Sequence, residues 1–406
     1  MNPYRKDFPI LDAAVKGRPL VYLDNAATMQ MPKQVMEAMM NQQSCFHSNV
    51  HRGIHSLSEL STRRMEEARE HIAGFIGAES ASEIIFTSGT TAGINMAARS
   101  FIDTFLQPGE EIISTQMEHH SNYLPWRETS PEKQGVFLSC PIDRNGDLDM
   151  DAFSSLLSPR TLIVAVTYVS NVTGAVNPVK EIIKKAHIAG AAVLLDCAQA
   201  MRHEKIDVRD LDCDFCVFSG HKIGGPTGTG ILYGKSEMLE LMKPVLYGGG
   251  TVREVTDRVT AYEDVPYRFE AGTPNITGII GLDAAVSYLE NTGIENISET
   301  EKELLSLTEE ILAASDRVNI LGKPKERAGA ISFTVDGLGS FDVAKLLDTQ
   351  GIAVRSGHHC AMPLHQAYGI DGSVRISPAF YNTPEEIGQF ETTMKRILGM
   401  QCTMHN

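Results

Sequence analysis

The chain has 406 residues and a formal net charge of −15, with 42% hydrophobic and 21% charged residues. This composition supplies enough apolar side chains for a large core and excludes wholesale disorder, and the length suggests about two or three domains. The acidic balance argues against nucleic acid and anionic membranes as main partners, because phosphate groups bind clustered lysine and arginine. With no apolar export signal or membrane-length run, and with seven scattered cysteines, we expect a cytoplasmic protein.

Strands and helices alternate through the first two thirds of the chain. A helix is expected over about 57–76, preceded by Ser56 and Glu59 in the spacing of a capping box. Apolar strands separated by helical segments are then expected at 84–86, 111–115, 161–169, 191–195, 214–218 and 231–233. This alternation predicts an α/β domain with a mainly parallel sheet.

Polar residues stand where several of these strands end. Thr90 and Thr91 lie in a loop of small residues that leads into a helix, and free N–H groups at such a helix start favour an anion such as phosphate. An ordinary capped helix fits this loop equally well. His119 follows the strand at 111–115, and Asp196 ends the strand at 191–195. Ligands of α/β sheets bind at this edge, and a carboxylate there needs a cationic partner.

Lys222 lies between the strand at 214–218 and a glycine-rich turn that leads into the next strand. Most lysines are solvated, but a lysine held in so short a connection can form a Schiff base with a carbonyl group. Lys222, Asp196 and the phosphate loop at Thr90 and Thr91 together predict pyridoxal 5′-phosphate as cofactor, with His119 available to cover its ring.

The character of the chain changes beyond residue 292. Helices at 299–315, 341–349 and 384–398 and strands at 330–335 and 352–354 predict a smaller α+β domain. We expect residues 19–292 to form the large domain, and residues 1–18 with 293–406 to form the smaller one. Cys360 lies there in a polar loop beside Arg355 and two histidines. Cationic neighbours favour a thiolate, so the loop indicates a nucleophile rather than a core cysteine.

A metal site is not expected. Cys213 and Cys216 have C-x-x-C spacing, but no second pair follows, so core packing is the better interpretation. The histidines around Cys360 have no further residues to complete a ligand set.

The site segments, taken in order, resemble those of cysteine desulfurases. They are Glu118-His119-His120, Asp196-x-x-Gln199, Ser219-Gly220-His221-Lys222 and Arg355-Ser356-Gly357-His358-His359-Cys360. The chain is most similar to the group II enzymes of the sulfur-mobilisation (Suf) type, which are related to selenocysteine lyases. The resemblance runs from about Phe8 to Asn382. It implies the fold-type-I architecture of transferases that use pyridoxal phosphate, a homodimer, and a Suf-type acceptor protein that takes the sulfur for iron–sulfur cluster assembly.

The resemblance also implies how the cofactor is held. Lys222 is the expected Schiff-base lysine and the acid/base at Cα, and Asp196 the partner of the pyridinium nitrogen. The remaining expected contacts are Gln199 to the ring oxygen, His119 stacked on the ring, Thr91, Ser219 and His221 on the phosphate, and Thr273 on the phosphate of the partner subunit.

For the substrate, the resemblance implies that Arg375 binds the carboxylate of L-cysteine, with Arg355 and Asn171 nearby. Cys360 then attacks the substrate sulfur and keeps it as a persulfide, while L-alanine leaves. L-selenocysteine is an alternative substrate. A class V aminotransferase or kynureninase-like enzyme on the same fold is a weaker alternative, since transamination needs no thiol. Intact Lys222, Asp196 and Arg375 argue against a scaffold without cofactor.

Overall fold

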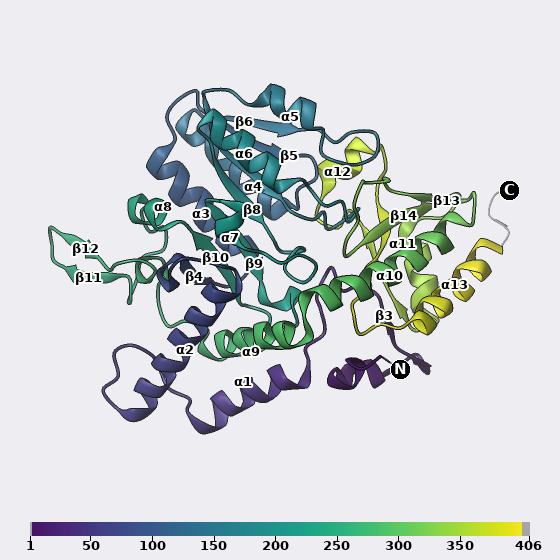
Figure 1. Ribbon diagram of the computed structural model, residues 1–406, viewed down its shortest axis with the longest axis horizontal. Helices are drawn as coiled ribbons and strands as arrows, with labels where there is room; N and C mark the ends of the chain where they lie inside the picture. The colour runs from purple at the N-terminus through teal and green to yellow at the C-terminus, as the bar shows by residue number, and fades with distance from the viewer. Residues whose placement is uncertain (1, 400–406) are drawn as a thin grey trace.

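The computed structural model describes residues 2–399 and has a seven-stranded sheet at the centre of its larger half (Figure 1). In spatial order the strands are β4 (Ile84–Thr87), β10 (Gly230–Gly234), β9 (Phe215–Ser219), β8 (Ala192–Asp196), β7 (Thr161–Thr167), β5 (Glu111–Thr115) and β6 (Val136–Cys140). Strands β9, β8, β7, β5 and β6 are parallel, whereas β10 runs antiparallel to both β4 and β9. The predicted mainly parallel sheet is confirmed.

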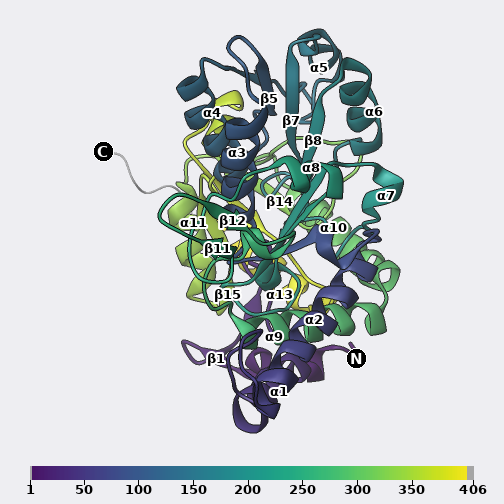
Figure 2. The ribbon, with the colours of Figure 1, turned by 90° about the vertical axis from the view of Figure 1, so that its left-hand side faces the viewer.

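Helices cover both faces of this sheet. One face packs against α3 (Thr90–Phe105), α4 (His120–Thr129) and α8 (Ser236–Leu241), and the other against α2 (Ser56–Phe75), α5 (Met150–Leu156), α6 (Val179–Ala189), α7 (Val208–Leu211) and α9 (Ile276–Thr292). Figure 2 shows β5, β7 and β8 between α3 and α4 on one side and α6 and α7 on the other. Successive strand residues point to opposite faces of the sheet. Ile85 packs in the hydrophobic cluster that contains α3, and Phe86 packs in the one that contains α2.

The start of α2 differs from its prediction. Ser56 is the first residue inside the helix, and His55 is the N-cap, whose Nδ1 accepts a hydrogen bond of 3.3 Å from the Ser58 N–H. The predicted capping box of Ser56 and Glu59 is therefore wrong, because an imidazole acceptor one residue earlier takes the capping role. The helix ends as expected, before Gly77 with its positive φ of 70°.

A second, antiparallel sheet lies in the other half of the molecule (Figure 1). Its strands, in spatial order, are β13 (Val318–Ile320), β14 (Ile331–Val335), β17 (Ser373–Ile376) and β16 (Arg355–Gly357). Helices α10 (Ile294–Ala313), α11 (Ser340–Asp348) and α13 (Pro384–Gly399) pack with it into a separate hydrophobic cluster. Helix α10 starts before the predicted residue 299, because Gly293 alone separates it from α9.

The N-terminal segment also reaches this second half. Strand β3 (Val21–Tyr22) pairs in parallel with β15 (Ile352–Ala353), and Val21 and Leu23 belong to the same cluster as α10 and α13. The division of the chain into domains at residues 19 and 293 stays a prediction.

Two further α-helices and two hairpins complete the α-helices and strands of residues 2–399. They are α1 (Lys33–Cys45), α12 (Met362–Ala367), and the hairpins β1 (Ala14–Val15) with β2 (Arg18–Pro19) and β11 (Val252–Val255) with β12 (Thr260–Tyr262). Within residues 2–399, none of the helices is long and apolar enough to cross a membrane. Cys213 and Cys216 are fully buried in the core, as predicted.

Candidate active site

A cavity of about 200 Å³ lies where the carboxyl ends of the parallel strands face the loop that carries Cys360. All the predicted site residues except Thr273 and Arg375 line it. A larger cavity of about 600 Å³ lies beside α3 and residues 269–275, but it contains none of Lys222, Asp196 and Cys360. We therefore take the smaller cavity as the site, because the charged and nucleophilic groups converge there.

Lys222 ends a short 3₁₀ turn, Gly220–Lys222, directly after β9. Gly220 is required in this turn, because a Cβ there would lie 2.5 Å from the Thr229 Oγ1. The Lys222 Nζ donates to the Ala26 carbonyl, which also accepts a hydrogen bond of 2.8 Å from the Gln199 Nε2. Burial, with the charge of Arg375 as a second cause, lowers the pKa of Lys222 to about 7. A large fraction of this amine is thus uncharged and nucleophilic near neutral pH.

Asp196 is the last residue of β8 and is almost fully buried. Among residues 2–399, the one hydrogen bond to its side chain is donated by the Ala198 N–H, at 2.9 Å from Oδ1. Burial raises the pKa of Asp196 to about 6, although this hydrogen bond and the charge of Lys222 act in the opposite direction. A buried carboxylate with so few partners is suited to a cationic ligand group.

Hydroxyl groups gather at the start of α3. The Thr90 N–H donates to the Ser219 Oγ at 2.7 Å, and the Thr90 and Ser219 hydroxyls are also 2.7 Å apart. The Thr91 Oγ1 lies 2.6 Å from the Ser121 Oγ at the start of α4. His221 completes this end of the cavity. Ser121 was not predicted from the sequence, although its position two residues after His119, at the start of a helix, could have indicated it.

His119 is the N-cap of α4, and its Nδ1 accepts a hydrogen bond of 3.1 Å from the Ser121 N–H. Because Nδ1 accepts, we assign the ring proton to Nε2. Burial, reinforced by the charge of Lys222, lowers the pKa of His119 to about 3, so the ring is neutral. The neighbouring Glu118 is fixed by the Thr167 N–H at 2.9 Å and the Asn122 Nδ2 at 2.7 Å, which holds this segment against the sheet.

Cys360 follows β16 in a loop of unusual backbone geometry. His359 and Cys360 have φ values of 51° and 58°, a left-handed conformation that residues other than glycine rarely adopt. The opposite wall holds this loop: the Asn171 Nδ2 donates to the His359 carbonyl at 2.8 Å, and the His120 N–H donates to the Cys360 carbonyl at 2.7 Å. The Arg355 Nη2 lies 3.7 Å from the Cys360 Sγ, where it can stabilise a thiolate.

A chain of buried side chains supports the loop from behind. The His365 Nδ1 lies 3.0 Å from the Ala361 carbonyl and must donate to it, so its Nε2 accepts from the Ser373 hydroxyl at 3.0 Å. The Ser373 oxygen in turn accepts from the His359 Nε2 at 3.0 Å, which leaves the His359 Nδ1 buried without a partner among residues 2–399. Burial and the charge of Arg375 lower the pKa of His359 to about 2.

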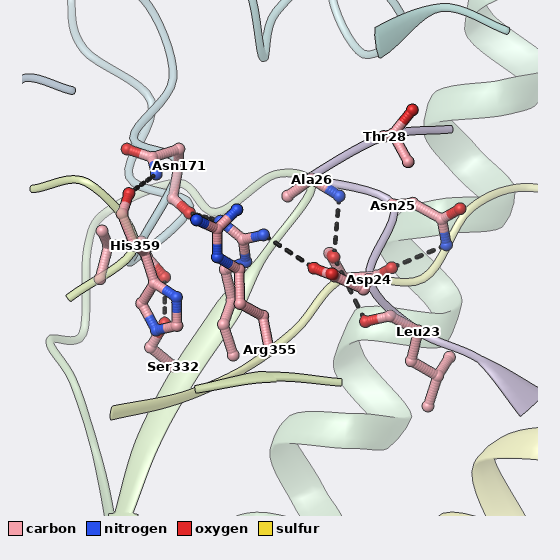
Figure 3. Close-up of polar contacts among 12 residues, drawn as sticks. Leu23, Asp24, Asn25, Ala26, Thr28, Asn171, Ser332, Arg355 and His359 are labelled. Carbon is pink, nitrogen blue, oxygen red and sulfur yellow. Dashed lines mark hydrogen bonds and ion pairs between the residues drawn. The ribbon is translucent and has the colours of Figure 1, made fainter. Parts of the chain in front are cut away.

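Arg375 stands on β17 behind the cavity wall and is only 1% exposed. Its Nη1 donates to the Asn171 carbonyl at 2.9 Å, and its Nη2 donates to the Asp24 Oδ1 at 2.9 Å. Figure 3 shows Asp24 and Asn171 on two sides of the arginine side chains. Asp24 was not among the site residues predicted from the sequence.

Thr273 is exposed and lies outside the cavity. Its predicted contact with a partner subunit stays a prediction.

Comparison with known proteins assigns this chain to a family. The family model described as Aminotransferase class-V matches residues 21–390. This chain belongs to the aminotransferase class-V family. It is 46% identical over 395 residues to a cysteine desulfurase of Pectobacterium carotovorum subsp. carotovorum (strain PC1), with 97% of each chain covered. It is 45% identical over 383 residues to a probable cysteine desulfurase of Halalkalibacterium halodurans, with 94% of each covered.

Two solved structures of cysteine desulfurases are similar to this chain. An apo cysteine desulfurase from Thermococcus onnurineus NA1 is 39% identical, with a TM-score of 0.93 and 98% of each chain covered. The cysteine desulfurase CsdA (S-sulfonic acid) from Escherichia coli is 38% identical, with a TM-score of 0.90 and 97% of each chain covered. The expected fold-type-I architecture is confirmed.

Pyridoxal 5′-phosphate is the cofactor that this family indicates, and the residues present fit it. Lys222 supplies a buried amine with a lowered pKa, and Asp196 supplies a buried carboxylate that has no cationic partner within 4.0 Å among residues 2–399. The hydroxyls of Thr90 and Ser219 lie at the N-terminus of α3, where the helix dipole favours a phosphate.

Proposed function

We propose that this chain is a cysteine desulfurase, which converts L-cysteine to L-alanine and retains the sulfur as a persulfide on Cys360. The observation that carries this proposal is that Lys222, Asp196 and Cys360 line one cavity, although Cys360 lies in a loop that follows a strand of the second sheet. An amine for attachment, a carboxylate for the ring nitrogen and a thiol for the sulfur are the groups that this reaction requires.

The large sheet holds the cofactor in this proposal. Lys222 would attach the cofactor, Asp196 would pair with its pyridinium nitrogen, and Gln199 would contact its ring oxygen. The neutral His119 would cover the ring, and Thr90, Thr91, Ser219 and His221 would hold the phosphate. The chemistry that bound pyridoxal 5′-phosphate supplies is the withdrawal of electrons from the Cα of the amino acid joined to it.

Lys222 then serves as the base that removes the Cα proton of the substrate. Its lowered pKa supports this role, because a base whose pKa lies near the working pH is available in its neutral form and still accepts a proton readily. Arg375 binds the substrate carboxylate, and Asn171 and Arg355 complete that end of the site.

Cys360 carries out the sulfur transfer. Its thiolate attacks the substrate sulfur, so that an S–S bond forms as the Cβ–S bond breaks. The electron pair left on the substrate carbon is protonated, and L-alanine is released. Arg355, at 3.7 Å from the Sγ, stabilises the thiolate before the attack.

We also propose a compartment, an oligomeric state and a sulfur acceptor for the enzyme. We place the enzyme in the cytoplasm as a homodimer, in which the exposed Thr273 reaches the phosphate of the partner subunit. A Suf-type acceptor protein takes the persulfide sulfur for iron–sulfur cluster assembly. Light scattering coupled to size-exclusion chromatography tests the dimer, and a monomer at micromolar concentration would remove this part of the proposal.

The proposed reaction is tested with holoenzyme, L-cysteine and a thiol reductant. Wild-type enzyme should release sulfide and L-alanine in equal amounts, and Cys360→Ala should release neither above background. Cys45→Ala is the matched control, since Cys45 is exposed and lies outside the cavity. Without reductant, mass spectrometry should find one added sulfur atom on Cys360. Equal sulfide from wild type and Cys360→Ala would rule out the persulfide, and pyruvate in place of L-alanine would indicate a different reaction on this fold.

A further inference from the structure

Arg375 is a buried cation whose hydrogen bonds are only partly filled. Two of its nitrogens have partners, namely the Asn171 carbonyl and the Asp24 carboxylate, each at 2.9 Å. Its Nε is buried and has no partner among residues 2–399. A guanidinium can present two parallel N–H groups to one carboxylate, but here Asp24 already occupies part of it with a single oxygen.

The second cation beside Arg375 is Arg355. The two arginines are directly opposite each other on the neighbouring strands β16 and β17, so their side chains leave the same face of the sheet. Within residues 2–399, Asp24 is the only carboxylate that forms an ion pair with either arginine. Of the two neighbouring positive charges, Arg375 is paired with a carboxylate, whereas Arg355 has no carboxylate partner within 4.0 Å among residues 2–399.

Asp24 is held rigidly in this position. Its backbone forms a parallel bridge with Ser377, the Asn25 N–H donates to the Ser377 carbonyl at 3.1 Å, and the Ala26 N–H donates to the Ser377 Oγ at 2.9 Å. Ser377 lies two residues after Arg375 on the same extended segment. Figure 3 shows Asp24 beside Leu23, Asn25 and Ala26, with a dashed line that joins its carboxylate to a guanidinium.

The exposure of the two partners is unequal. The side chain of Arg375 is 1% exposed, whereas that of Asp24 is 21% exposed. An unpaired buried guanidinium is strongly destabilising, so an arginine that awaits a substrate carboxylate needs a resident anion. The same resident anion repels any second carboxylate that approaches the arginine.

We infer that Asp24 is a positioning residue that holds Arg375 in the empty site and, through its own negative charge, weakens the binding of substrate and product carboxylates. This inference rests on the proposed function of Arg375 as the binding group for the substrate carboxylate. It assigns to Asp24 a role in product release: the carboxylate that keeps the arginine in place also prevents L-alanine from binding too tightly.

Binding of L-alanine to the holoenzyme tests the inference without turnover. The binding is followed by calorimetry and by the change in cofactor absorbance. Asp24→Asn keeps a hydrogen-bond acceptor for Arg375 but removes the charge, and it should tighten L-alanine binding by about tenfold, as expected for the loss of a like charge at short range in a partly buried site. Asp24→Ser removes the charge with a smaller side chain and should act in the same direction.

Ethylamine is the matched control ligand, because it is L-alanine without the carboxylate and its binding should not respond to Asp24→Asn. In turnover, the KM for L-cysteine should fall in Asp24→Asn by a larger factor than kcat changes, whereas a merely structural defect would lower kcat and thermal stability together.

Two further results separate this inference from the proposed function. If Arg375→Lys binds L-alanine as well as wild type does, the role proposed for Arg375 is wrong and the inference fails with it. If Arg375→Lys weakens binding but both Asp24 variants bind L-alanine no more tightly than wild type, only the inference is wrong. Tighter binding of L-alanine, but not of ethylamine, in the Asp24 variants supports it.

Discussion

The two walls of the cavity are built in different ways. On one side, Lys222 and Asp196 stand at the ends of β9 and β8, whose residues are all buried in the large sheet. On the other side, Cys360 stands in a loop with two consecutive left-handed residues, and two hydrogen bonds from the opposite wall fix its backbone. The groups proposed to hold the cofactor therefore depend on sheet packing, whereas the group proposed to carry the sulfur depends on a few contacts across the cavity.

The largest effect is expected from a substitution on the sheet side of the cavity. Lys222→Ala should abolish covalent attachment of pyridoxal 5′-phosphate and lower turnover by at least about a thousandfold, because a positioned acid/base contributes about 10²–10⁴-fold by itself. Borohydride reduction followed by peptide mass spectrometry measures the attachment. Lys180→Ala, an exposed lysine outside the cavity, is the control and should keep the adduct. A reducible adduct in Lys222→Ala would show that another lysine anchors the cofactor.

A pH series tests the lowered pKa of Lys222, on the sheet side of the cavity. Lys222 has a pKa lowered to about 7, and only its neutral amine attacks an aldehyde. The neutral fraction rises with pH, so the rate of cofactor attachment to apoenzyme should increase by about tenfold from pH 6 to pH 8 and level off above that. Stopped-flow absorbance at each pH gives this rate. A rate that continues to rise to pH 10 would show that Lys222 keeps the pKa of an ordinary lysine.

The smallest expected effect lies on the loop side. Asn171→Ala removes the hydrogen bond to the His359 carbonyl and leaves that carbonyl unpaired. We expect sulfide release to fall by about fivefold, equivalent to about 1 kcal/mol for one lost hydrogen bond, while the cofactor absorbance stays as in wild type. The exposed Asn291→Ala is the control. Loss of the cofactor absorbance in Asn171→Ala would mean that the two walls are not separable.

The same contrast explains what the sequence could predict. Asp196 ends an apolar strand, Lys222 and Thr90 follow two others within three residues, and the carboxyl ends of parallel strands must meet at one edge. Local pattern was therefore enough to bring them together. The ion pair between Asp24 and Arg375 joins residues separated by 351 positions, and no local pattern encodes it.

Two other features could not be predicted from the local sequence. The hydrogen-bond chain through Ser373 needs the fold to bring His359 and His365 to the same hydroxyl. The start of α2 could be capped by Ser56 or by His55, and only the backbone conformation decides between them. The cysteine-desulfurase resemblance supplied the residue roles that local pattern alone left open.

The hydrophobic cluster of the second sheet is separate from those of the large sheet, and this has a consequence for enzyme engineering. Leu195, Cys197 and Ile223, which adjoin Asp196 and Lys222, belong to a cluster of the large sheet, whereas Val374 and Ile376 of β17 belong to the cluster of α10, α11 and α13. The side chains of residues 357–359 can therefore be varied without repacking the strands that present the lysine, whereas Cys360 is the proposed sulfur carrier and Ala361 is buried against Val172 and Leu364. Directed evolution toward new reactions on this scaffold should accordingly concentrate its libraries there and leave the large sheet untouched.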